Sequence, residues 1–128
     1  MDVTPLVPVG VQMIHGYGDG RFRIAETVID GPVLVMPQTT VPWAVATDLD
    51  LTTLDPETLN PILRAEPGFY ILLIGTGARQ VFLPPALRQS IRDQGPVVEM
   101  MNTGAACRTF NLLLAEARRV AAALLPVG

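Results

Sequence analysis

The segment FYILLIGTG, residues 69–77, decides the fold predicted for this chain. Its first six residues are all apolar, and turn-forming residues flank them, Pro67-Gly68 before and Gly75-Thr76-Gly77 after. A continuous apolar run of this length between turns is typical of a β-strand that is buried on both faces. The segment therefore predicts a strand in the interior of a sheet.

The residues that follow alternate between helix and strand patterns. Pro84-Pro85 begins a helix that Gly95-Pro96 ends, and residues 97–101 are the next apolar strand. Residues 105–125 contain no Gly or Pro and predict one long helix. Its buried stripe consists of Phe110, Leu113, Leu114, Ala117, Val120 and Leu124, with Arg119 on the exposed side. This order of elements predicts right-handed parallel crossovers.

The first half of the chain is expected to be β-structure. A hairpin is predicted at Asp19-Gly20, and a second turn at Asp30-Gly31 precedes the apolar strand of residues 33–36. Because proline has no backbone N–H, Pro42 restricts the strand of residues 41–45 to an edge or a bulge. The whole pattern predicts an α/β fold. It would be a single three-layer domain over residues 1–128, with a mixed sheet, a parallel β-α-β-α second half and extra strands from the N-terminal half.

Composition restricts the classes of function. Of the 128 residues, 49% are hydrophobic and 16% are charged, so the chain is expected to fold. The net charge of −3 argues against nucleic acid as a partner. No apolar run reaches the roughly 20 residues that span a bilayer, and residues 1–10 lack the pattern of a signal peptide. We therefore expect a cytoplasmic protein without membrane insertion.

The chain has one cysteine, Cys107, and one histidine, His15. This excludes an internal disulfide and a site of several thiolates, so the sequence predicts no metal and no cofactor. Cys107 stands beside Arg108 near the start of a predicted helix, where a thiolate would be stabilised. A catalytic cysteine also needs a base, and His15 belongs to a distant hairpin. A small buried thiol is the alternative, and a function without catalysis is favoured.

Two similar loops are the candidate ligand site. They contain Gly75, Thr76, Gly77 and Arg79 after the strand of residues 69–74, and Thr103, Gly104 and Arg108 after the strand of residues 97–101. Both would lie at the carboxyl edge of the sheet, where open α/β sheets bind ligands. Backbone N–H groups beside an arginine suit a phosphate or a carboxylate. In the alternative interpretation the loops are tight turns, and the arginines pair with carboxylates such as Glu99 or Asp48.

Five segments together resemble a known family: HGYGDGRFRI (15–24), GPVLVMP (31–37), VPWAV (41–45), LLIGTGARQVFLPP (72–85) and MNTGAACRTFNLLLAEARRVAAALLPV (101–127). This family of small domains of unknown biochemical function includes the mitochondrial NADH dehydrogenase (complex I) assembly factor three and the adipogenesis-associated protein. The resemblance implies a single α/β domain, a bacterial member and a role in assembly. Asn111 joins the loop residues as a position of the family's motif, whereas Cys107 departs from it.

Two hypotheses of function follow. In the first, the protein is a non-enzymatic assembly or scaffolding factor that binds a respiratory-complex subunit or another assembly factor. Pro42 and Trp43 are then the candidate contact residues, although Trp43 would serve equally as a core residue. In the second, the protein is a small-anion-binding protein or an enzyme that uses the two loops. The second requires the guanidinium groups of Arg79 and Arg108 to face a common cleft.

Overall fold

The computed structural model describes residues 10–128, and a five-stranded mixed sheet lies at its centre. Its strands are β4 (Val33–Val35), β5 (Thr40–Pro42), β6 (Ile71–Thr76), β7 (Val97–Met101) and β8 (Val120–Leu125), in the order β5-β4-β8-β6-β7. β6 is parallel to both β7 and β8, whereas β4 is antiparallel to β8 and β5. Of residues 1–10, which we expect to hold no signal peptide, all but residue 10 lie outside the described residues.

Helices and a second sheet cover the five strands. The helical segments are η1 (Leu51–Thr53), η2 (Pro56–Leu59), α1 (Asn60–Leu63), α2 (Pro85–Arg92) and α3 (Thr103–Ala115). The second sheet is antiparallel and consists of β1 (Ile14–Gly18), β2 (Arg21–Ile24) and β3 (Thr27–Asp30). None of the helices within residues 10–128 is long and apolar enough to cross a membrane.

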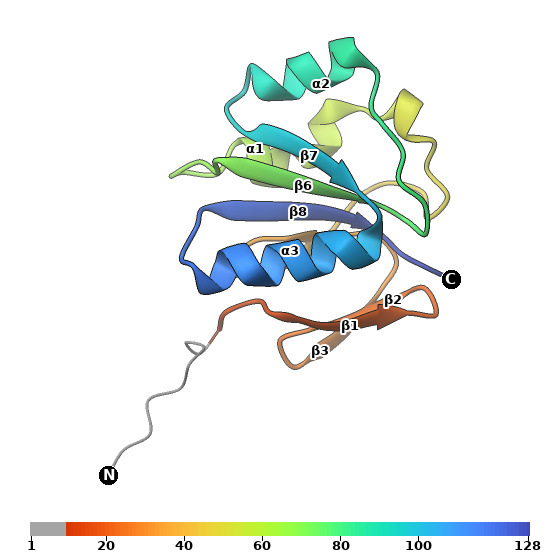
Figure 1. The fold of residues 1–128 in the computed structure, drawn as a ribbon, viewed down its shortest axis with the longest axis vertical. Helices are drawn as coiled ribbons and strands as arrows, with labels where there is room; N and C mark the ends of the chain where they lie inside the picture. The colour runs from red at the N-terminus through yellow and green to blue at the C-terminus, as the bar shows by residue number, and fades with distance from the viewer. Residues whose placement is uncertain (1–9) are drawn as a thin grey trace.

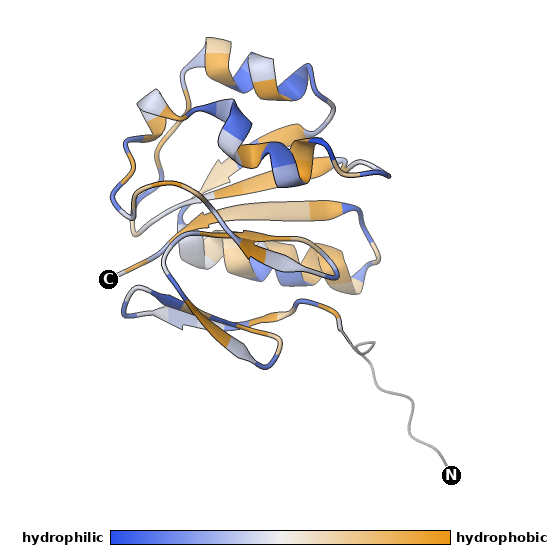
Figure 2. Cartoon of the chain, turned by 180° about the vertical axis from the view of Figure 1, so that it is seen from behind, coloured by the Kyte–Doolittle hydropathy of each residue, from blue (hydrophilic) through white to orange (hydrophobic). Residues whose placement is uncertain are grey.

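The central sheet separates two apolar cores. Figure 1 shows α2 above the strands and α3 below them, with the small sheet beyond α3. The upper core includes Leu59, Ile62 and Ile91, and the lower core includes Phe22 and Phe110. Figure 2 shows that the central strands are hydrophobic along their length, as expected for a sheet that is buried on both faces. The predicted mixed α/β architecture and the interior position of the strand that follows Phe69 are confirmed.

The prediction of one helix over residues 105–125 is wrong. Helix α3 ends at Ala115, and Val120–Leu125 forms β8 between β4 and β6. Val120, Ala122 and Leu124 contribute to the lower core, and the three residues between or after them contribute to the upper one. Helix propensity among ordinary residues differs by at most about 0.7 kcal/mol per residue. Burial of all six residues and hydrogen bonding to two strands outweigh that preference.

The end of α3 lacks the glycine that would mark it in the sequence. Ala117 adopts the left-handed conformation, with φ of 57°, and its N–H donates to the carbonyl of Leu114 at 3.0 Å. This conformation is unfavourable for a residue with a Cβ. Glycine removes this strain, although it also makes the unfolded chain more flexible. We therefore expect Ala117→Gly to raise the free energy of unfolding by a net amount of about 0.5–1 kcal/mol. Chemical denaturation checks this, and a lower midpoint would contradict the assigned helix end.

Pro42 and Trp43 have different surroundings. Pro42 ends β5, which lies at an edge of the sheet, as the missing N–H requires. Trp43 follows the strand and is only 2% exposed, and its indole Nε1 donates to Thr58 Oγ1 at 3.0 Å. Trp43 is therefore a core residue, and the prediction that it contacts a partner protein is wrong. Pro42 is exposed, and its contact role stays a prediction.

Candidate functional site

The two predicted loops meet at the carboxyl edge of the sheet. The backbone N–H of Thr103 donates to the carbonyl of Gly77 at 2.8 Å, and the N–H of Gly77 donates to Thr103 Oγ1 at 2.9 Å. The loop after β6 is thereby attached to the first residue of α3. Figure 1 shows the ends of β6 and β7, the start of α3 and the β1–β2 hairpin on the same side of the molecule.

Both threonine hydroxyls of the loops are engaged within the protein. Thr103 is fully buried, and its hydroxyl also donates to the carbonyl of Leu125 at 2.6 Å. The Thr76 hydroxyl is close to the carbonyls of Arg79 and Met101, and it accepts from the N–H of Val81 at 3.2 Å. These bonds connect the loops to the ends of the neighbouring strands. The hydroxyls are therefore structural groups.

Two glycines of the motif, Gly75 and Gly104, have no room for a Cβ because neighbouring residues pack closely against them. A Cβ at Gly75 would lie 3.1 Å from the Cα of Thr103 and 2.8 Å from a methyl group of Leu124. A Cβ at Gly104 would overlap the hydroxyl of Tyr17, which crosses the first turn of α3 from β1. The Arg108 Nη1 lies 3.4 Å from the same point. The hairpin, the helix and the Arg108 side chain therefore converge at Gly104.

The N-terminus of α3 is already capped by its own chain. The Asn102 side-chain oxygen accepts from the N–H of Ala105 at 2.8 Å, and the N–H of Thr103 is used by Gly77. Farther along the helix, the Asn111 side chain accepts from the N–H of Ile14 at 2.9 Å and donates to its carbonyl at 2.7 Å. Asn111 thus attaches β1 to α3 as a neighbouring strand would.

Arg79 and Arg108 are the charged groups that remain at this edge, and both are exposed. Within residues 10–128 neither side chain has a hydrogen-bond or ion-pair partner, and Glu99 and Asp48 are not paired with them. The ion pair that this part of the chain does form is Arg21–Asp30, at 2.9 Å on the outer sheet. Anion binding by the two loops stays a prediction, with these two guanidinium groups as its charged residues.

Cys107 is buried in α3 at 4% exposure. Burial raises the pKa of its thiol from an ordinary value of 9.0 to about 12, although the charge of Arg108 acts in the opposite direction. His15 lies on β1 with an exposed side chain. The thiol is therefore protonated at neutral pH, and the buried-thiol interpretation fits the structure. Among residues 10–128, no three His, Cys, Asp or Glu side chains are grouped so that they could hold a metal ion.

The raised pKa of Cys107 gives a prediction for stability at high pH. In the unfolded chain the thiol loses its proton near pH 9, whereas in the folded protein the thiol stays protonated up to about pH 12. The unfolded state then binds fewer protons, so the free energy of unfolding should fall as the pH rises from about 9 toward 12. Denaturation across this window checks it, with Cys107→Ala as the control. An equal decline in both proteins would contradict the buried thiol.

Three exposed apolar residues at this edge had no place in the sequence prediction. Phe82 is 67% exposed, Tyr17 is 44% exposed and Val81 is 38% exposed. Together with Arg79 and Arg108 they form what we call the carboxyl-edge surface. An aromatic residue in the non-periodic stretch between β6 and α2 is the sequence signal that could have identified Phe82. No sequence signal identifies Tyr17, because the sequence does not show that the β1–β2 hairpin reaches α3.

Comparisons with known proteins show what the chain is similar to. A family model described as "Protein of unknown function (DUF498/DUF598)" matches residues 14–125. An uncharacterized protein of Rhodobacter capsulatus is 40% identical over 119 residues, which cover 92% of this chain and 87% of that protein. The solution structure of a Bordetella pertussis protein described as an Mth938-like domain has a TM-score of 0.78 at 26% identity, covering 98% of this chain and 92% of that one.

A protein of Mus musculus is named NADH dehydrogenase (ubiquinone) 1 alpha subcomplex assembly factor 3. It is 36% identical over 113 residues, which cover 88% of this chain. The same residues cover 60% of the mouse protein, so the match spans little more than half of that relative's length.

Proposed function

Because this chain belongs to the family of proteins of unknown function described as DUF498/DUF598, we propose that it is a non-enzymatic assembly factor that binds other proteins. Relatives from mouse and zebrafish are named as assembly factors of NADH dehydrogenase. By this likeness the partner is a respiratory-complex subunit or another assembly factor. The proposal also includes a bacterial source and a cytoplasmic location.

The observation that carries the proposal is the carboxyl-edge surface. Aromatic residues and arginine are the residue types that contribute most often to the energy of protein interfaces. Phe82 and Tyr17 expose large apolar area there, and the two arginines lack carboxylate partners among the described residues. A partner that presents an apolar pocket surrounded by carboxylates complements this surface.

Addition of a partner's strand to the sheet is a less suitable mode of binding. Strand β7 is an edge strand, but two of its carbonyls already accept hydrogen bonds from side chains of the same protein. Arg88 Nη2 donates to the carbonyl of Val98 at 2.8 Å, and Gln80 Nε2 donates to that of Met100 at 3.0 Å. At the other edge, β5 has three residues and ends in Pro42. The proposal therefore relies on side-chain contacts at the carboxyl-edge surface.

The test compares Phe82→Glu with Leu112→Glu, both in the full chain. Leu112 is 60% exposed but lies nine residues beyond the start of α3, away from the carboxyl-edge surface. A partner is first captured at native abundance and then purified for binding measurements. We expect Phe82→Glu to weaken its binding by about tenfold or more, and Leu112→Glu to leave it nearly unchanged. Equal affinity of both variants would overturn the assignment of this surface.

The anion-binding alternative has a separate test. Thermal unfolding is measured with and without inorganic phosphate for the wild type, Arg79→Gln and Arg108→Gln. If the protein acts through protein contacts alone, phosphate leaves the unfolding temperature of each of the three proteins nearly unchanged. A rise in the wild type that both substitutions remove would favour the alternative, because ligand that binds only the folded state raises its stability.

A further inference from the structure

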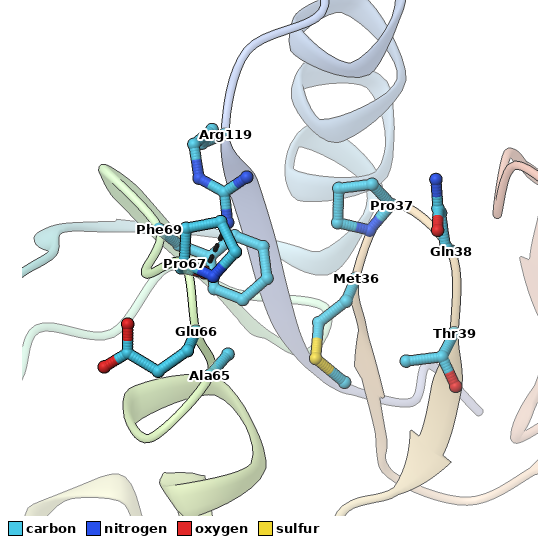
Figure 3. Close-up of a pocket in the computed structure, with 9 residues that line it drawn as sticks. All are labelled: Met36, Pro37, Gln38, Thr39, Ala65, Glu66, Pro67, Phe69 and Arg119. Atoms are coloured by element: carbon cyan, nitrogen blue, oxygen red, sulfur yellow. Dashed lines mark hydrogen bonds between the residues drawn. The ribbon is translucent and has the colours of Figure 1, made fainter.

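A groove lies at the end of the sheet opposite the carboxyl-edge surface, where β6 and β8 begin. Its volume is about 390 Å³, within the range of small-molecule sites. The turn between β4 and β5 forms one wall, and the segment that follows α1 forms the other. Figure 3 shows Phe69 and Arg119 on one side of the open space and Met36 and Pro37 on the other. None of the residues predicted to bind a ligand lines this groove.

Arg119 is held in place at this groove. Its Nε donates to the carbonyl of Gly68 at 2.5 Å, its Nη2 donates to the carbonyl of Pro67, and its Cζ lies 5.2 Å from the centre of the Phe69 ring. The prediction that Arg119 lies on the exposed side of a helix is therefore wrong, because Arg119 precedes β8 and is half-buried. A side chain that is already fixed loses little conformational entropy when it binds a ligand.

The charge of Arg119 has no counter-charge in the part of the chain that the structure describes. Both of its hydrogen bonds go to neutral carbonyls, and no ion pair forms within residues 10–128 at this position. Glu66 lines the same groove, and Figure 3 shows its carboxylate turned away from the guanidinium. A fixed, partly buried cation beside apolar walls attracts an anion more strongly than a solvated side chain does.

We propose that this groove binds a small monocarboxylate with an apolar body. The guanidinium of Arg119 accommodates the carboxylate, since its Nη1 is not used within the described residues and guanidinium groups match carboxylates geometrically. Met36, Pro37 and Phe69 supply apolar walls for the rest of the molecule. Glu66 also lines the groove, and its negative charge, although turned away from the guanidinium, disfavours a doubly charged ligand, so a monoanion is preferred over a phosphate dianion.

The first experiment titrates the full chain with 3-phenylpropanoate, its neutral amide and inorganic phosphate, and follows backbone amide resonances by NMR. We expect the acid to shift the resonances of Gln38, Thr39 and Gly68, which lie in or beside the groove. Its dissociation constant should be about tenfold lower than that of the amide, because only the acid pairs with Arg119. Phosphate should leave these resonances unchanged. Equal binding of acid and amide, or shifts confined to the carboxyl-edge surface, would overturn the proposal.

Three variants test the same site. Arg119→Gln should weaken binding of 3-phenylpropanoate by about tenfold or more, and Arg118→Gln is the matched control because Arg118 is exposed and does not line the groove. Glu66→Gln should strengthen binding two- to threefold, by an order-of-magnitude estimate, because it removes a like charge. Should Arg119→Gln fail to fold, the acid–amide comparison and Glu66→Gln decide the question. A folded Arg119→Gln that binds as the wild type does would overturn it.

This proposal is independent of the proposed assembly role. The groove and the carboxyl-edge surface share no residues. Loss of acid binding in Arg119→Gln with unchanged capture of a protein partner would support the groove alone. Loss of the partner in Phe82→Glu with unchanged acid binding would support the surface alone.

Discussion

Phe110→Ala is expected to lower the free energy of unfolding by about 3–5 kcal/mol. Phe110 is fully buried in the lower core, where α3 packs on β6 and β8. Removal of its ring leaves a cavity that the surrounding side chains fill only in part, so lost transfer energy and lost contacts add. Urea denaturation monitored by circular dichroism measures the change.

Leu112→Ala is the control for this prediction, because it removes an apolar side chain from the same helix on its exposed face. Its effect should stay within about 0.5 kcal/mol. Similar denaturation midpoints for the two variants would show that α3 packs through a different face. Leu113, which belongs to the same predicted stripe, is only half-buried and should have an effect between the two.

Thr103→Val is expected to cost about 2–4 kcal/mol of stability. Valine keeps the shape of threonine but leaves the carbonyl of Leu125 and the N–H of Gly77 without the hydroxyl that now bonds both. Each buried polar group that loses its partner costs about 1–3 kcal/mol. The loop after β6 should also become more accessible to amide hydrogen exchange, since Thr103 attaches it to α3.

Thr103→Ser separates this structural role from a role in ligand binding. Serine keeps the hydroxyl, so its stability should remain much closer to that of the wild type than that of the valine variant. A Thr103→Val protein as stable as Thr103→Ser would mean that the hydroxyl is idle in the fold. It would then be available to a ligand, as the anion-binding hypothesis requires.

The sequence predicted the parts of the fold that depend on neighbouring residues. The apolar run before Gly75, the hairpin at Asp19-Gly20 and the proline-initiated helix α2 all appear where expected. It also predicted that the two Thr-Gly loops lie at the carboxyl edge of the sheet, because both follow parallel strands, and the structure shows that they contact each other. The pattern predicted loop residues as candidates for a site, but it did not show which of their polar groups are already bonded within the protein.

Tertiary structure alone decided the fate of residues 116–125, of Trp43 and of the loop hydroxyls. An alanine-rich segment has a helical preference of a few tenths of a kcal/mol per residue, and only the space between β4 and β6 makes the strand more favourable. Thr103 bonds to Leu125, which is 22 residues away in the chain and adjacent in the structure. Local patterns determine propensity and turns, whereas burial and hydrogen bonding between distant segments determine which of the competing states a segment adopts.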